Sequence, residues 1–411
     1  MNHWMKKAVP AAAVLVLTMG QSFASDAEGE FHGYFRESVG SSSGGRGPQS
    51  CFGLGGNTQR YRLGNECDAY GEFEYQKEIA KSANGVSFVG HIMAAVYNPQ
   101  SDVAGADLSL SKLYVEAKGL DALKGGTAWM GRRYYQRPDA HMLDWQYINM
   151  NGTGGGVDRI PMGVGKFSYA FFKDNDVVKK SATRQILGYQ DIAVNTDGAI
   201  DILATFIRPD SNTADAHSGW QLTLLHKQAK VLGGGNVVGF QHGVGPGTGA
   251  GGQCCNRMGA TGSIANGSDV TRTRIFDSLQ IQPTADFSAE MVAVIQRDKS
   301  NASGGTSTWT TLGVRPVYAL TDNFKLQFEL GTDRVTSPTG GAAARLTKFT
   351  FAPTLTMGRD YWSRPELRAF VTYGKWNDAA TAMVNKANES GPVYGNGTSG
   401  TSVGLHLEAW F

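Results

Sequence analysis

Residues 131–147, GRRYYQRPDAHMLDWQY, place three arginines, two aspartates and a histidine among four aromatic residues. Asp139, His141 and Asp144 have side chains suited to acid–base chemistry or to binding a metal ion. These three residues do not by themselves form a known metal site, and no serine nucleophile pairs with His141 in a recognisable pattern. The same residue types suit the polar lining of a passage. The glycines of GTGGG, residues 152–156, suit a chain that turns back after this stretch.

The first residues of the chain carry an export signal. Lys6 and Lys7 precede an apolar run at residues 8–19, and the tripeptide SFA ending at Ala24 supplies a small-x-small cleavage site. This pattern predicts a secretory signal peptide over residues 1–24. Its apolar run is too short to span a bilayer, so it does not predict a transmembrane helix.

The predicted mature chain, residues 25–411, is balanced in charge and rich in glycine. Removing two lysines from 38 basic residues leaves 36, against 36 acidic residues. This balance gives no support for nucleic acid as a partner. Glycine supplies 54 of the 411 residues, about twice its usual frequency. No later stretch offers about 18 consecutive apolar residues. The sequence therefore predicts an exported β-protein, either periplasmic or an outer-membrane barrel.

Several predicted strands are apolar on one side only. In TSVGLHLEAWF, residues 401–411, the odd-numbered positions from 403 onward are apolar, and the even-numbered positions include His406 and Glu408. Residues 324–330, FKLQFEL, alternate in the same way, and so do residues 71–79. A period of two over about ten residues is typical of a tilted strand that faces lipid on one side and water on the other.

A soluble β-sandwich also has alternating strands. A transmembrane barrel is favoured because the strands reach about ten residues rather than the usual 5–6, and because their polar faces repeatedly carry charge. Stretches rich in Gly, Ser, Thr and Asn at residues 40–56, 244–267 and 379–401 are typical of loops. At about 20 residues per strand with its loop, the mature chain predicts one all-β domain, an antiparallel barrel of about 18 strands around an aqueous channel.

The four cysteines of an exported chain lie in an oxidising compartment. Cys51 and Cys67 enclose 15 residues, and a bridge that closes such a loop contributes about 3 kcal/mol in the chain-entropy model. Cys254 and Cys255 are adjacent, and neighbours rarely bond to each other without strain. Four cysteines allow three pairings; we predict Cys51–Cys67 and leave the other pair open. The spacing fits no zinc-ligand pattern, and we expect no metal or other cofactor.

Five motifs carry a family resemblance. They are FHGYFR (31–36), YRLGNEC.AY.E (61–72), YQR.D.HM.D (135–144), WSRP..R.F.TY.KW (362–376) and the closing E.W (408–410). In these motifs, and in their order, the mature chain resembles the maltoporin family from its N-terminus to its last strand. The resemblance implies a homotrimer of 18-stranded barrels in the lipid of the Gram-negative outer membrane, each with its own sugar channel.

Maltoporins line one wall of the channel with a row of aromatic rings, the aromatic slide, and the opposite wall with charged side chains, the polar track. The resemblance assigns the slide to Tyr34, Tyr70, Trp362 and Trp410. It assigns the track to Arg36, Arg62, Glu72, Arg137, Asp139 and Asp144. Strand alternation by itself also puts Glu72 and Trp410 in the lumen. Interfacial aromatic girdles remain the alternative for these rings, above all for Trp362, which has no alternating context.

The chain departs from the maltoporin pattern at the predicted constriction, which we assign to residues 131–147 folding into the lumen. The usual narrowing tyrosine falls on Gln146, and the nearby acid falls on Asn149. The second external loop has no aromatic residue, and Ser111, beside Lys112, replaces an arginine of the pattern. The middle aromatic of the slide has no match in this chain, and the nearest alignment places Val238 there. These changes predict a wider and less charged waist.

The sequence therefore predicts an outer-membrane sugar porin rather than an enzyme. It would pass maltose and maltodextrins, or another small glycoside, by facilitated diffusion. A sucrose-type or broader sugar porin is the alternative within the family. A general diffusion porin with no sugar site is the alternative outside it. An outer-membrane barrel enzyme would need a nucleophile that the sequence does not offer.

Overall fold

The computed structural model describes residues 28–43, 49–56, 58–173, 181–210, 215–252, 256–259, 262–386 and 393–411. The predicted signal peptide, residues 1–24, lies outside the described residues, and so do Cys254 and Cys255. In the described ranges, no helix combines the length and the apolar character needed to cross a membrane.

Eighteen strands form one closed antiparallel barrel, which confirms the predicted fold class and strand number. In chain order they are β1 (Glu30–Ser42), β2 (Ala69–Lys81), β3 (Ser87–Asn98), β4 (Asp107–Lys118), β5 (Thr127–Arg133), β9 (Gly152–Met162), β10 (Gly165–Lys173), β11 (Ala182–Asn195), β12 (Gly198–Pro209), β13 (Gly219–Val231), β14 (Gly234–Val244), β16 (Thr271–Ile281), β17 (Phe287–Ser300), β18 (Gly305–Thr321), β19 (Phe324–Thr336), β20 (Ala344–Thr356), β21 (Glu366–Trp376) and β22 (Ser399–Trp410). Each strand pairs with its neighbour in the chain, and β1 pairs with β22, where Tyr34 lies opposite Trp410.

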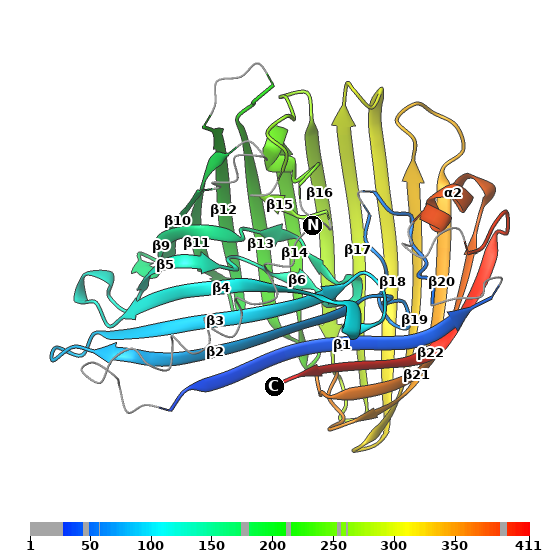
Figure 1. Cartoon of the computed structure of the whole chain (residues 1–411), viewed down its shortest axis with the longest axis horizontal. Helices are drawn as coiled ribbons and strands as arrows, with labels where there is room; N and C mark the ends of the chain where they lie inside the picture. The colour runs from blue at the N-terminus through cyan, green and yellow to red at the C-terminus, as the bar shows by residue number, and fades with distance from the viewer. Residues whose placement is uncertain are drawn as a thin grey trace, which may run out of the picture.

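The smaller elements belong to the loops. They are the short strands β6 (Asp139–Ala140), β7 (Trp145–Gln146), β8 (Ile148–Asn149) and β15 (Met258–Gly259), the single turns η2 (Val103–Gly105), η3 (Asp121–Leu123), η4 (His141–Leu143) and η5 (Gly245–Thr248), and helix α2 (Asp378–Lys386). The front strands β1 to β4 cross the rear strands β12 to β18 at a steep angle, because strands of a barrel tilt about its axis (Figure 1).

The barrel is apolar outside and charged inside, as the alternation predicts. On β22, Leu405 is 59% exposed, whereas its neighbours His406 and Glu408 are 4% and 0% exposed. On β19, Leu330 points outward, and Glu329 is completely buried. A soluble sandwich would bury the leucines and expose the charges. The opposite arrangement is the one required when lipid surrounds the wall and water fills the interior.

The loop between β5 and β9, residues 134–151, folds into the lumen as predicted; we call it L3. Its apolar side chains are buried against the barrel wall, where the Trp145 ring lies 5.4 Å from Phe276 and 6.2 Å from Trp309. Backbone groups of L3 also bond to the wall: the amide of Met142 donates to Glu290 (3.2 Å). Burial of the aromatic rings, worth about 1.5–3 kcal/mol for a large apolar side chain, gives L3 its position inside the barrel.

The glycines that follow L3 have a different role from the predicted one. Residues 152–156 do not turn back but begin strand β9. A Cβ atom on Gly154 would lie 1.9 Å from the carbonyl oxygen of Phe171, and one on Gly156 would lie 2.3 Å from that of Tyr169. The glycines therefore allow β9 and β10 to approach each other more closely than side chains would permit.

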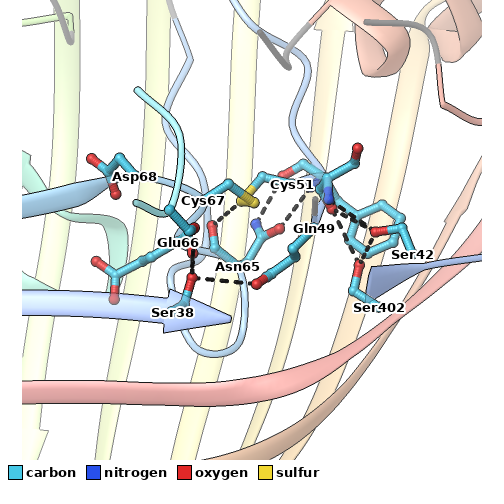
Figure 2. Close-up of a disulfide and its surroundings, with 12 residues drawn as sticks. Ser38, Ser42, Gln49, Cys51, Asn65, Glu66, Cys67, Asp68 and Ser402 are labelled. Atoms are coloured by element: carbon cyan, nitrogen blue, oxygen red, sulfur yellow. Dashed lines mark hydrogen bonds between the residues drawn. A yellow bond between two sulfur atoms is a disulfide. The ribbon is translucent and has the colours of Figure 1, made fainter. Parts of the chain in front are cut away.

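The loop between β1 and β2, which we call L1, is closed by the predicted disulfide between Cys51 and Cys67. Figure 2 shows Asn65 beside this bridge, and its side chain joins the two halves of the loop. Its Oδ1 accepts from the amide of Phe52 (2.6 Å), and its Nδ2 donates to the carbonyl of Phe52 (2.9 Å). Ser38 of β1 donates to the carbonyl of Glu66 (2.6 Å), which attaches the loop to the wall.

Replacing Cys51 and Cys67 together with serine tests how far the bridge holds L1. Loss of the cross-link should lower the free energy of local opening by about 3 kcal/mol. We expect trypsin to cleave after Arg60 much faster in the double variant, while the urea stability of the barrel stays the same. Wild-type protein treated with a reductant is the control and should behave like the variant. Equal cleavage rates with and without the bridge would show that the hydrogen bonds of L1 suffice.

Candidate functional site in the lumen

A cavity of about 1040 Å³ lies inside the barrel, between L1, L3 and the wall formed by β1 to β4 and β22. Of the twelve residues predicted for the slide, the track and the constriction, all except Asn149 line this one cavity. Residues more than 370 positions apart in the chain meet there, because β1 and β22 close the barrel.

The four predicted slide residues form a continuous row of rings, which we call the aromatic row. Ring centroids are separated by 6.1 Å from Tyr70 to Tyr34, 6.4 Å from Tyr34 to Trp410, and 6.3 Å from Trp410 to Trp362. Tyr34, Tyr70 and Trp410 project inward from adjacent strands. Trp362 lies in the turn between β20 and β21 and is 44% exposed, yet it lines the cavity rather than an outer girdle.

Tyr97 extends the aromatic row and was not recognised from the sequence. It lies opposite Tyr70 in the register of β2 and β3, and their ring centroids are 6.5 Å apart. It lines the cavity and is 45% exposed. The signal was present in the alternation of β3, because Tyr97 shares the parity of the buried lumen residues His91 and Met93.

The arginines of the polar track are embedded in ion pairs. Arg36 contacts Glu66 (3.0 Å), Asp68 (2.8 Å) and Asp144 (2.9 Å). Arg62 of L1 contacts the same Glu66 and also Glu408 of β22, each at 2.7 Å. It also donates to the hydroxyl of Tyr34 (2.7 Å), which fixes that ring in the row. Within these pairs, the carboxylate of Asp144 is 38% exposed and presents acceptor oxygens to the cavity.

Glu72, Arg137 and the hydroxyl of Tyr70 form a second polar group at the Tyr70 end of the row. Nη1 of Arg137 lies 3.3 Å from Glu72, and the hydroxyl of Tyr70 donates to the same carboxylate. Lys112 also reaches the cavity, because it alternates in phase with Tyr114 and Glu116 on β4, and its Nζ lies 2.6 Å from Glu74. A lysine therefore enters the lumen one position after Ser111, where the sequence had indicated a lost arginine.

Asp139 lines the cavity and has an altered acidity. Burial of its surroundings, followed by the nearby Glu290, raises the pKa of Asp139 to about 6. Asp144 faces the same cavity with its backbone in the left-handed conformation (φ 48°). L3 thus presents two carboxylates to the channel, and one of them titrates just below neutral pH.

The structure separates the two residues assigned to the constriction. Gln146 lines the cavity and accepts a hydrogen bond from Arg257, which belongs to the loop between β14 and β16, here called L6. Asn149 is 1% exposed and does not line the cavity, because its strand β8 pairs with β15 of L6. Its assignment to the constriction is therefore not supported.

Val238, the residue aligned with the middle aromatic of the slide, does not face the lumen. It lies on the outer face of β14 and is 39% exposed. The inward position next to it is Gly239, where a Cβ atom would lie 2.2 Å from the ring of Phe276. Phe276 is buried against L3, so the aromatic row stops before this part of the wall.

His141, the histidine of the opening motif, is a structural member of this site. It lies between the rings of Trp362 (5.0 Å) and Trp410 (5.9 Å) and within 3.0 Å of Arg62. Burial and the neighbouring arginines lower the pKa of His141 well below its usual value, which keeps the ring neutral. Among the residues that the structure describes, no group of three or more His, Cys, Asp or Glu side chains is arranged to hold a metal ion.

The family model for the LamB porin matches residues 30–411. Salmonella typhi OmpF, solved in complex with daunomycin, is 9% identical with a TM-score of 0.51, and the alignment covers 93% of this chain and 97% of that chain. The anion-selective porin from Comamonas acidovorans is 10% identical with a TM-score of 0.50, covering 93% and 99%. Acinetobacter baumannii OccAB2 is 10% identical with a TM-score of 0.50, covering 95% and 100%. At these identities the three structures share the fold.

The family match extends from the first barrel strand to the last residue, and the maltoporin resemblance is confirmed by it. The closed barrel and the cavity inside it fit a channel better than an enzyme. This chain therefore belongs to the LamB porin family and is a porin of the outer membrane.

Proposed function

We propose that this porin passes maltose and maltodextrins, or another small glycoside, across the outer membrane by facilitated diffusion. The observation that carries the proposal is the aromatic row, with Tyr97 at one end and Trp362 at the other, inside a cavity that also holds ion-paired arginines. No energy source is required, because the sugar moves down its own concentration gradient.

The chemistry of a sugar ring fits both sides of this cavity. A pyranose has an apolar face that can stack on Tyr34 or Trp410, and a rim of hydroxyls that needs donors and acceptors. Arg36 and Glu72 present both kinds of group beside the rings. Several similar weak sites in series let a solute enter and still leave, whereas one tight site would block transport.

Two kinds of sugar porin fit the residues at the constriction: a maltodextrin porin and a sucrose-type or broader sugar porin. The resemblance aligns Gln146 with the tyrosine that narrows a maltoporin, and Arg257 donates to Gln146. The loss of this ring favours the broader, sucrose-type alternative. Ion current through a planar bilayer, measured while maltotriose, maltohexaose and sucrose are titrated, distinguishes the cases. Saturable block that strengthens with glucan length supports a maltodextrin slide. Equal weak block by all three supports the broader porin, and no block by any sugar supports a general diffusion porin.

We also propose that the protein works as a homotrimer embedded in outer-membrane lipid. The wall supports this because Leu405, Leu367 and Leu355 of adjacent strands expose their side chains on the outer face. Such a surface requires lipid or another subunit as its cover. Native mass spectrometry in detergent would report three chains per particle if the proposal holds.

Replacing Trp410 with alanine should weaken the block by oligosaccharides about fivefold, because a lost ring contact costs about 1 kcal/mol. The ion conductance should remain roughly intact, since the ring carries no charge. Titration of single channels with maltohexaose measures both quantities. Tyr373→Ala is the control, because Tyr373 is an aromatic on the outer wall. Unchanged block in Trp410→Ala would remove this residue from the slide.

Acidification should shift the ion selectivity of the channel toward anions. The pKa of Asp139 is raised to about 6, so its carboxylate is charged above that pH and neutral below it. We expect the reversal potential in a KCl gradient to move toward anion selectivity between about pH 7 and pH 5. In Asp139→Asn, the reversal potential should already be shifted toward anion selectivity at about pH 7, and it should change less between about pH 7 and pH 5. The same pH profile in the variant would assign the effect to another group.

A further inference from the structure

A positive charge without a negative partner stands at the constriction. Arg257 of L6 lines the cavity, and its Nη2 donates to Oε1 of Gln146 on L3. Within the described part of the chain, no carboxylate lies within ion-pair distance (4.0 Å) of its guanidinium. Its Nε is buried and has no hydrogen-bond partner. By contrast, Arg36, Arg62 and Arg137 each have a carboxylate within 3.3 Å.

The residue before Arg257 is held firmly by the wall. The carbonyl oxygen and Oδ1 of Asn256 both accept from Nη2 of Arg274 (2.8 Å each). The indole of Trp145 donates to the same carbonyl (3.2 Å), and Nδ2 of Asn256 donates to Gln296 (3.0 Å). These bonds join L6, L3 and the wall at one point. The guanidinium of Arg257 is therefore attached to a fixed backbone, so little ordering is needed for it to bind a solute.

A second guanidinium, that of Arg137, lines the same cavity as Arg257. Burial, followed by the nearby Arg137, lowers the pKa of Arg257 to about 10, so the side chain remains charged at neutral pH. Nε of Arg137 is also buried without a partner, and its Nη1 shares the Glu72 carboxylate with the hydroxyl of Tyr70. An anionic group would relieve the repulsion between the two arginines. Guanidinium donors match the oxygens of a carboxylate or a phosphate.

The described carboxylates of L3 form no ion pair with Arg257, and Asp144 acts on its guanidinium only at longer range. Oδ2 of Asp144 lies 2.9 Å from Arg36 and is used there. Asp139 forms no ion pair among the described residues, and its strongest electrostatic neighbours are Glu290 and Arg62, not Arg257. The unpaired charge of Arg257 therefore lies on the side of the constriction where L6 meets Gln146.

We propose that Arg257, together with Arg137, forms an anion-binding subsite at the constriction that favours short saccharides carrying a carboxylate or a phosphate monoester over neutral ones. The inference rests on the proposed function, because it assigns the substrate class of the same channel. A sugar ring on the aromatic row would bring its charged substituent to Arg257 as it passes the waist. A hydrogen bond to a charged group contributes more than one to a neutral hydroxyl, so the preference should be measurable.

The test compares neutral and acidic disaccharides in the same channel. Block of the ion current by maltose, maltose 1-phosphate and digalacturonate is titrated at low ionic strength, where screening is weak. We expect the acidic sugars to block at about tenfold lower concentration than maltose. Arg257→Gln should remove this preference and change maltose block by less than about threefold. Arg257→Lys, which keeps the charge, should retain most of it and shows that the site tolerates substitution.

Arg60→Gln is the matched control, because Arg60 lines the same cavity from L1 without an ion pair among the described residues. The subsite is supported if an acidic sugar blocks more strongly than maltose, and if Arg257→Gln abolishes this difference while Arg60→Gln preserves it. The acidic sugar that blocks more strongly identifies the anion. If Arg257→Gln and Arg60→Gln lose the preference for acidic sugars equally, the proposal is overturned, because the preference would then come from the overall positive charge of the cavity. If maltose blocks the wild-type channel as well as the acidic sugars do, the subsite is rejected and the sugar porin stands. If no saccharide blocks, the proposed function itself fails.

Discussion

The buried ion pairs that join L1 to the barrel wall are the interaction on which the lumen depends. Glu66 of L1 contacts Arg36 of β1 and His406 of β22, and Arg62 of L1 contacts Glu408. Removing one partner of such a pair costs about 3–5 kcal/mol, because the other charge stays buried without compensation. The same arginines hold Tyr34 and Asp144 in place. The positions of Tyr34 in the aromatic row and of Asp144 at the cavity therefore depend on charges on two strands and one loop.

L3 divides the interior into a filled half and an open half. On one side, Trp145 and Tyr147 pack against Phe276 and exclude water. On the other side, Asp144 and Gln146 face the cavity. A barrel of this size is too wide for side chains of the wall alone to fill. An amphipathic loop solves this problem by turning one half of the lumen into a core and leaving a path for solutes in the other.

Local sequence patterns predicted which residues of the barrel wall face inward, but they did not predict the contacts at the constriction. Alternation identifies inward residues such as Glu408 because each strand has a period of two, and the same rule would have found Tyr97. Trp362 lies in a turn with no such period, so only the family resemblance pointed to it. Asn149 and Arg257 depend on the contact between L3 and L6, which are more than 100 residues apart. No periodicity in either loop records that contact.

The aromatic row crosses the seam where the barrel closes. Tyr34 belongs to the first strand and Trp410 to the last, and the backbone of Phe411 bonds to Gly33 at 3.0 and 3.1 Å across the same seam. In a sheet whose ends have not yet met, the rings on either side of the seam belong to opposite edges. The solute path therefore does not exist in an unclosed folding intermediate. The saccharide recognition that we propose would therefore require the closed barrel, and binding of a sugar would report that the last strand has paired with the first.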